Sequence, residues 1–270
     1  MRGAIGLVLL LLPALGFGFG FGFGFAGPAR ADQGVGPLSL SGTLAASGQT
    51  SDRAGVAAEP NGELELDAKL PMGPGVWRME MLGSTTPPGQ GVSRVFGEAN
   101  GLVGETLTGS GKDRLAMTEL FYTAPVARGH VRGGVLYAPD YLDTNDVADD
   151  EYRQFLGQSF IFDPIVDFPF YAPALEADAT IGRGVAVTAL VSSLNGLENG
   201  RHTYADMLAL GGPGHDAFAV LESEWRGSGL SGNIGVWDNS GRHPMLANAG
   251  AGKDDFGIYG NLGGGDRALN

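Results

Sequence analysis

The 270-residue chain contains no cysteine, so no disulfide framework supports its fold. Basic residues are also scarce, because 17 Lys and Arg stand against 30 Asp and Glu. Nucleic-acid binding needs a basic face, and this balance argues against nucleic acid as a partner. The four histidines lack metal-ligand spacing, and no Gly-x-Ser-x-Gly elbow is present. The sequence therefore predicts no enzyme activity, no cofactor and no metal site.

The N-terminal segment has the features of a secretory signal. Arg2 supplies a basic start, an apolar run follows, and Ala29-Arg30-Ala31 fits a cleavage site. Gly-Phe units between Gly16 and Phe25 lengthen the apolar run to about the span of a membrane helix. We predict a signal peptide over residues 1–31, with its retention as an anchor as the alternative. Cleavage would remove two of the 17 basic residues and leave all 30 acidic ones.

No apolar run of membrane-helix length follows the signal. Any membrane-spanning form of the chain must then be a β-barrel, because only helices and closed barrels satisfy their backbone hydrogen bonds in lipid. Segments of about ten residues do alternate apolar and polar side chains, as strands with one apolar face do. In residues 61–70, Leu64 and Leu66 point to one face while Glu63 and Glu65 point to the other. A surface strand of a soluble sandwich alternates equally well.

The gaps between these segments are alternately long and short. We predict ten strands, at about residues 38–47, 61–70, 77–81, 114–124, 130–138, 172–181, 185–194, 216–225, 230–237 and 255–262. Outer-membrane barrels have this rhythm because their periplasmic turns are tight and their outer loops are long. The fold class predicted for residues 32–270 is therefore all-β, an antiparallel transmembrane β-barrel of porin type.

The chain stops at Asn270, where an eleventh strand should begin. Outer-membrane barrels usually end on an aromatic residue, and Asn270 does not fit that pattern. We expect the sequence to be the N-terminal part of a larger, incomplete barrel. A closed ten-stranded barrel with side chains filling its interior is the competing interpretation.

The middle of the chain carries five short motifs, Thr118-Glu119-Leu120-Phe121, Arg132-Gly133-Gly134, Asp143-Thr144-Asn145, Phe155-Leu156 with Phe160, and Phe168-Pro169. Through these motifs the chain resembles the OprB-like carbohydrate-selective porins. Two departures stand out. The family usually has a basic residue after its Arg-x-Gly, where this chain has Val135, and the family barrel has sixteen strands, while about ten are predicted here.

The resemblance implies a passive channel for sugars in the bacterial outer membrane. It also implies carbohydrate substrates and contact with outer-membrane lipid and lipopolysaccharide, and a homo-oligomer is an expectation from porins in general. Two other functions stay open from the sequence. The first is a non-conducting structural or adhesive outer-membrane barrel, and the second is a secreted soluble β-protein.

Candidate channel-lining residues come from the strands and from one long connection. Strand parity places Arg78, Glu80, Glu119 and Arg132 on the polar face, and an arginine facing lipid at mid-bilayer would cost about 2–4 kcal/mol. Their alternative role is ion pairing that stiffens the wall. The connection of residues 139–171 is the predicted constriction, with site residues Asp143, Asp146, Tyr152 and Arg153. For any single loop acid, a solvated position near lipopolysaccharide-bound cations is the favoured interpretation.

Overall fold

The structure is a computed structural model of the chain. It describes residues 24–35, 37–85, 89–95, 114–144, 166, 168–197, 204–208, 216–227, 229–241 and 255–263. These ranges hold all of the strands discussed below. Of the predicted site residues, Asp146, Tyr152 and Arg153 lie outside them.

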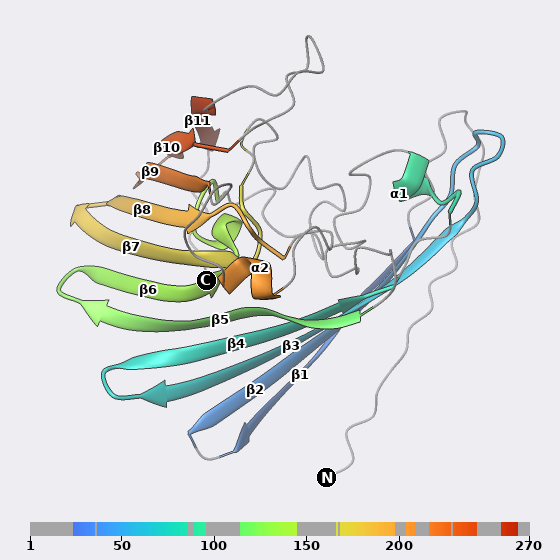
Figure 1. The fold of residues 1–270 in the computed structure, drawn as a ribbon, viewed down its shortest axis with the longest axis horizontal. Coiled ribbons are helices and arrows are strands. Elements are labelled where there is room, and N and C mark those ends of the chain that lie inside the picture. Colours follow the sequence, from blue (N-terminus) through green and yellow to red (C-terminus); the bar gives the residue numbers. More distant parts are fainter. Residues whose placement is uncertain are drawn as a thin grey trace.

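In the described residues, eleven strands form one antiparallel sheet in strict sequence order, from β1 to β11 (Figure 1). The strands are β1 Gly24–Val35, β2 Leu38–Gln49, β3 Glu59–Met72, β4 Gly75–Ser84, β5 Arg114–Val126, β6 Gly129–Leu136, β7 Ala172–Gly182, β8 Val185–Ser193, β9 Ala217–Arg226, β10 Ser231–Asn239 and β11 Asp255–Gly263. The described parts of the connections hold three short helices, namely α1 Val92–Val95, η1 Ala138–Asp140 and α2 Tyr204–Leu208. No described helix is long and apolar enough to span a membrane. The predicted all-β antiparallel class is confirmed.

The connections alternate in length as predicted. Tight turns join β1 to β2, β3 to β4, β5 to β6, β7 to β8 and β9 to β10, and the intervening connections are longer. All tight turns therefore lie at one end of the sheet, because successive antiparallel strands reverse direction. At this end Trp77 packs against Tyr122 with ring centroids 5.4 Å apart. Such a pair matches the aromatic girdle of a membrane barrel.

Strand β1 is the one strand beyond the ten that the sequence predicts. Its residues, Gly24–Val35, pair with β2 from Gly24 opposite Gly48 to Val35 opposite Leu38. The segment has no regular apolar alternation, so its pairing is set by the neighbouring strand and was not visible in the sequence. Eight of its residues, 24–31, overlap the predicted signal peptide. Cleavage after Ala31 would leave only residues 32–35 of β1, and that cleavage stays a prediction.

The sheet is curved and open in the described part of the chain. Figure 1 shows the strands wrapping around a concave side on which α2 lies. Strand β1 pairs only with β2, and β11 pairs only with β10. The two edge strands therefore do not close the sheet, and this openness agrees with the predicted incomplete barrel.

Apolar side chains cover the convex face. Leu44 is 57% exposed, Leu175 60% and Phe256 78%, although all three are large and apolar. Other exposed apolar side chains with the same strand parity are Leu40, Leu64, Leu66, Leu70, Leu115, Leu120, Val126, Ile181, Val191, Leu221, Ile234, Val236, Ile258 and Leu262. A soluble protein rarely exposes a contiguous apolar surface of this extent. The face is suited to contact with lipid chains.

The concave face carries an apolar cluster at the end with the long connections. Leu190, Phe218 and Trp237 from the sheet pack together with Leu142, Phe168 and Phe170 from the connection between β6 and β7. Phe168 lies edge-on to Phe218 with ring centroids 5.7 Å apart. Parts of the long connections thus fold inward and fill the interior at this end. The remaining interior, toward the tight turns, is lined by charged side chains.

Candidate functional site

Charged side chains of strands β3 to β9 gather on one face of the sheet. The concave side carries twelve acidic side chains among the described residues of these strands and of residues 138–144. They are Glu59, Glu63, Glu65, Asp67, Glu80, Glu119, Asp140, Asp143, Glu176, Asp178, Glu222 and Glu224. The basic ones are Lys69, Arg78, Arg132 and Arg226, together with His130, and Arg114 occupies the concave register position opposite Ser84. The convex positions of the same strands are apolar or small. This partition is the one that a membrane barrel with an aqueous interior and a lipid-facing exterior requires.

Arg78 of β4 is the centre of the first cluster. Its guanidinium lies 3.2 Å from a carboxylate oxygen of Asp67 and 3.2 Å from one of Glu80. Glu119 contributes a further oxygen at 3.5 Å. The strand register explains this convergence, because Asp67 lies opposite Glu80, and Glu80 opposite Glu119, on three adjacent strands. One guanidinium thus holds three carboxylates of the wall together.

A β-bulge in β5 brings an extra polar side chain to this cluster. Glu80 pairs with Glu119, but the next residue, Met81, pairs with Met117, so Thr118 has no direct opposite residue. Thr118 and Glu119 are consequently both fully buried on the concave side. The Thr118 hydroxyl donates a hydrogen bond to Glu80 at 2.8 Å. Simple alternation would have sent Thr118 outward, so the sequence could not predict this contact.

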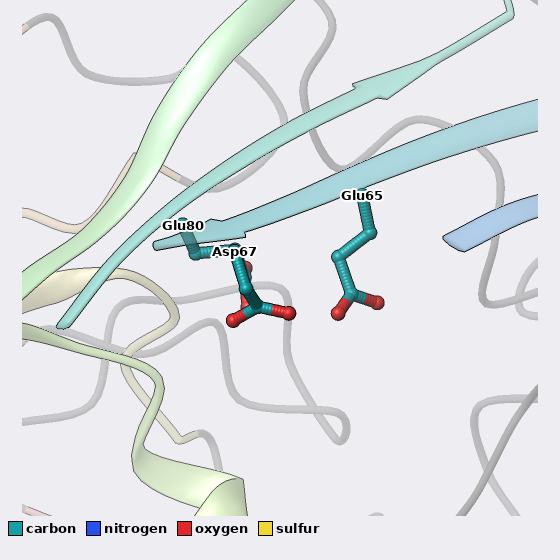
Figure 2. Close-up of side chains that lie close together, drawn as sticks. All are labelled: Glu65, Asp67 and Glu80. Atoms are coloured by element: carbon teal, nitrogen blue, oxygen red, sulfur yellow. The ribbon is translucent and has the colours of Figure 1, made fainter. Parts of the chain in front are cut away.

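Glu65, Asp67 and Glu80 bring their carboxylate oxygens within 4.8 Å of one another (Figure 2). Oxygens of this kind are the ligands that Ca²⁺ and Mg²⁺ prefer. Two of the three carboxylates already contact Arg78, and Glu80 also accepts the Thr118 hydrogen bond. Positive charge is therefore supplied by the protein itself, and we interpret the group as the carboxylate side of the Arg78 cluster.

Arg132 of β6 is the centre of the second cluster. Its Nη1 atom donates to Glu176 Oε2 and to Asp178 Oδ2, each at 2.5 Å. Both acceptors lie on β7, where Glu176 is directly opposite Arg132. His130 Nδ1 lies 3.3 Å from the same Asp178 oxygen. The second arginine is therefore held by the neighbouring strand in the same manner as the first.

The backbone conformation at position 134 explains why the Arg-x-Gly motif ends in glycine. Its φ is +146°, which side-chain-bearing residues rarely adopt. A Cβ atom there would lie 2.2 Å from the Leu120 carbonyl oxygen of the adjacent strand. Only glycine permits this close approach of β5 and β6, two residues beyond Arg132.

The inner loop, residues 138–144, crosses the concave side and links the two clusters. Asp140 lies 3.8 Å from Arg78, and the Tyr141 ring lies under the Arg132 guanidinium with 4.7 Å from Cζ to the ring centroid. Tyr141 also meets Phe121 edge-on, with ring centroids 6.3 Å apart. Burial raises the pKa of the Tyr141 hydroxyl above its ordinary value, so this phenol is neutral at physiological pH.

The other end of the inner loop is fixed to β9 and β11. The backbone N–H of Asp143 donates to Glu222 Oε2 at 2.7 Å, and the Tyr259 hydroxyl donates to the same oxygen at 2.7 Å. Asn261 donates its side-chain amide to the Asp143 carboxylate. Asp143 has a φ of +58°, a region in which Asp is among the better tolerated residues. The loop therefore spans the interior from β4 and β6 to β9 and β11.

A cavity of about 440 Å³ remains beside the two arginines, toward the tight turns. Lys69, Arg78, Thr123, His130, Arg132, Phe121 and Tyr141 line it, together with Pro74, Gly75, Val76 and Pro125. Hydrogen-bond donors and two aromatic rings thus face the same space. Such a surface can bind hydroxyl-rich solutes through donors and through the ring faces.

The structure places the predicted strand residues Arg78, Glu80, Glu119 and Arg132 on the concave face, and it brings the first three into one cluster. Asp143 also lies inside, but its backbone and carboxylate are bonded to the wall, so it anchors the loop. The site residues predicted from the sequence do not include the partners Asp67, Tyr141, Glu176, Asp178 and Glu222. Strand parity places the four acids on the polar face, and Tyr141 lies in the predicted constriction, but their pairing with the arginines depends on strand register and on the loop path. A role in a constriction stays a prediction for all of these residues.

An apolar convex face, a charged concave face and inward-folded long connections define a porin-type β-barrel fold. Among solved structures, the chain is similar to the high-pH structure of Pseudomonas putida OprB, with a TM-score of 0.53 at 13% sequence identity. The match covers 89% of this chain and 61% of the OprB chain, so this chain spans about three fifths of that length. No family model and no curated protein matches the sequence. The chain has an OprB-like fold, as the motifs in its sequence predict.

Proposed function

We propose that this chain forms the wall of an outer-membrane channel through which sugars diffuse passively. The observation that carries the proposal is the partition of side chains across the sheet. Guanidinium and carboxylate groups line the concave side, and large apolar side chains stand exposed on the convex side. Only a water-filled interior and a lipid-facing exterior make both faces favourable together.

The inner loop supports a constriction in this channel. It narrows the interior and places Tyr141 against Arg132 beside the 440 Å³ cavity. A sugar passing this point would meet hydrogen-bond donors on the arginines and the faces of Tyr141 and Phe121. Weak binding of this kind at several sites allows a solute both to enter and to leave. The OprB-like fold is consistent with this function.

A non-conducting structural barrel is the second candidate. The apolar cluster around Phe168, Phe218 and Trp237 fills the interior at the end with the long connections. If this packing extends across the whole barrel, solutes would not pass. The same outer-membrane location and the same convex surface fit both candidates, and only flux distinguishes them.

The test is solute flux through the full chain reconstituted in liposomes. Neutral mono- and disaccharides should enter faster than into protein-free liposomes, and Arg132→Ala should change that rate. Arg128→Ala, in the exposed turn between β5 and β6, is the matched control and should leave it unchanged. Absence of flux with folded protein would favour the structural barrel, and unchanged flux in Arg132→Ala would restrict that residue to a structural role.

A further inference from the structure

We infer that the interior beside Arg78 and Arg132 carries a net negative potential, so that the channel favours neutral and cationic sugars and discriminates against sugar acids and phosphorylated sugars. This inference rests on the proposed function for its biological meaning. The potential itself is a property of the folded wall and can be measured without any transport.

Carboxylates outnumber basic groups on the concave side. Among the described residues of β3 to β9 and the inner loop, twelve carboxylates face it, against five permanently basic residues, one of which is Arg114 at the concave register position opposite Ser84. Seven of these carboxylates are buried. Leaving all seven out of the balance would leave five carboxylates against five basic residues. The negative sign of the potential therefore comes from the buried acids and requires that they are at least partly ionised.

The two arginines at the cavity do not reverse this balance locally. The surface of the 440 Å³ cavity presents Arg78, Arg132 and Lys69, together with His130, and these groups in isolation would attract an anion. Each guanidinium is already compensated, Arg78 by Asp67, Glu80 and Glu119, and Arg132 by Glu176 and Asp178. The arginines can therefore donate hydrogen bonds into the cavity without contributing a net positive field there.

A wall of this charge acts differently on neutral and anionic solutes. Interactions between charges are stronger in a narrow interior with low-dielectric walls than in bulk water, and such clefts concentrate ions of the opposite sign by roughly 10- to 1000-fold. A carboxylate or phosphate on a sugar would be repelled by the excess of acidic groups. A hydroxyl group meets no such repulsion and can still accept hydrogen bonds from the guanidiniums.

The chain contains no cysteine, which makes an introduced thiol unique. Thr123 is a small residue that lines the cavity, so Thr123→Cys is a near-isosteric reporter of the local potential. Ser41→Cys is a second reporter, because Ser41 lies opposite Asp67 in the β2–β3 register. Ala54→Cys, exposed in the connection between β2 and β3, is the control outside the interior.

The measurement is the ratio of reaction rates of each thiol with a cationic and an anionic methanethiosulfonate reagent, using the full chain folded in detergent. We expect this ratio in the Thr123→Cys and Ser41→Cys variants to exceed the ratio in Ala54→Cys by at least about tenfold at low salt. It should fall toward the control value at about 1 M salt, where the screening length is about 3 Å. Adding Asp178→Asn to the Thr123→Cys variant should lower the ratio.

A ratio in both interior variants equal to or below that in the Ala54→Cys control would overturn the inference. Flux then supplies a separate answer about the proposed function. If glucose and glucosamine enter and glucuronate enters slowly, both the channel and the charge discrimination are supported. If glucuronate enters faster than glucose, the charge discrimination is overturned and the channel is retained. A high thiol ratio with no flux of any sugar would retain the potential and reject the channel.

Discussion

The backbone N–H of Asp143 donates a hydrogen bond to Glu222 across 79 positions of sequence, at 2.7 Å in the barrel interior. The same carboxylate oxygen also accepts from the Tyr259 hydroxyl. One buried glutamate on β9 therefore ties the inner loop to the far wall. Because Asp140 and Tyr141 contact Arg78 and Arg132 at the near wall, the loop is held at both ends. The interior geometry depends on these two attachments.

Replacing Glu222 with Ala should release the far end of the inner loop. Loss of the shared acceptor leaves the Asp143 N–H and the Tyr259 hydroxyl without this partner, and each such buried donor costs about 1–3 kcal/mol. Hydrogen exchange in residues 138–144 should therefore accelerate, and the protein should unfold at lower denaturant concentration. Glu224→Ala is the matched control on the same face of β9, because its partner Arg226 is 65% exposed and the pair contributes little. Equal hydrogen-exchange rates of residues 138–144 in both variants would contradict the role of Glu222 in holding the inner loop.

Arg78→Ala should destabilise the wall more than any other single arginine substitution among the described residues. Three carboxylates would lose their shared cation, and breaking a buried ion pair by removing one partner typically costs about 3–5 kcal/mol. Lysine should restore only part of the stability, because one ammonium cannot match the planar, five-donor fork of the guanidinium. Equilibrium unfolding in detergent measures the difference, with Arg226→Ala as the exposed control. A loss below about 1 kcal/mol would show that the carboxylates do not need Arg78.

The sequence predicted the strands and their faces well because each property is local. A side-chain period of two assigns Leu64 and Glu65 to opposite faces without any knowledge of the neighbouring strands. The same parity places Arg78 and Arg132 inside. The bulge at Thr118 breaks parity, and it depends on the pairing of two strands rather than on either strand alone. The alternation within one strand therefore cannot reveal the position of Thr118.

Contacts made by the inner loop were beyond prediction for a different reason. The acidic motif Asp143-Thr144-Asn145 is visible in the sequence, but its partner Glu222 belongs to β9, which lies beyond β7 and β8 in the sheet order. Loop paths are set by packing at long sequence separation, which no periodicity encodes. The strand β1 escaped prediction because Gly24–Val35 has no regular alternation and takes its register from β2.

Gly134→Ala and Gly133→Ala form a matched pair that tests the close approach of β5 and β6. At Gly134 a Cβ would lie 2.2 Å from the Leu120 carbonyl oxygen, with φ at +146°, and strain of this kind costs about 1–3 kcal/mol. At Gly133 the Cβ would lie 3.6 Å from a Leu175 methyl group, an ordinary contact. Equilibrium unfolding should therefore show a clear loss for Gly134→Ala and a small effect for Gly133→Ala. Equal effects would mean that the two strands do not approach this closely.

The assignment of the convex face to lipid is tested by one substitution on each face of neighbouring strands. Leu66 points outward and is 38% exposed, and arginine at mid-bilayer on the lipid face of a barrel costs about 2–4 kcal/mol. Ser41 points inward opposite Asp67, so an arginine there gains a carboxylate neighbour in an aqueous interior. Leu66→Arg should therefore lower the free energy of unfolding in lipid vesicles by several kcal/mol, whereas Ser41→Arg should change it little. When the two variants are refolded from urea into buffer without lipid, the difference between their free energies of unfolding should vanish, because no bilayer then contacts the convex face. A smaller loss for Leu66→Arg than for Ser41→Arg in vesicles would reverse the assignment of the two faces, and the channel would lose its physical basis.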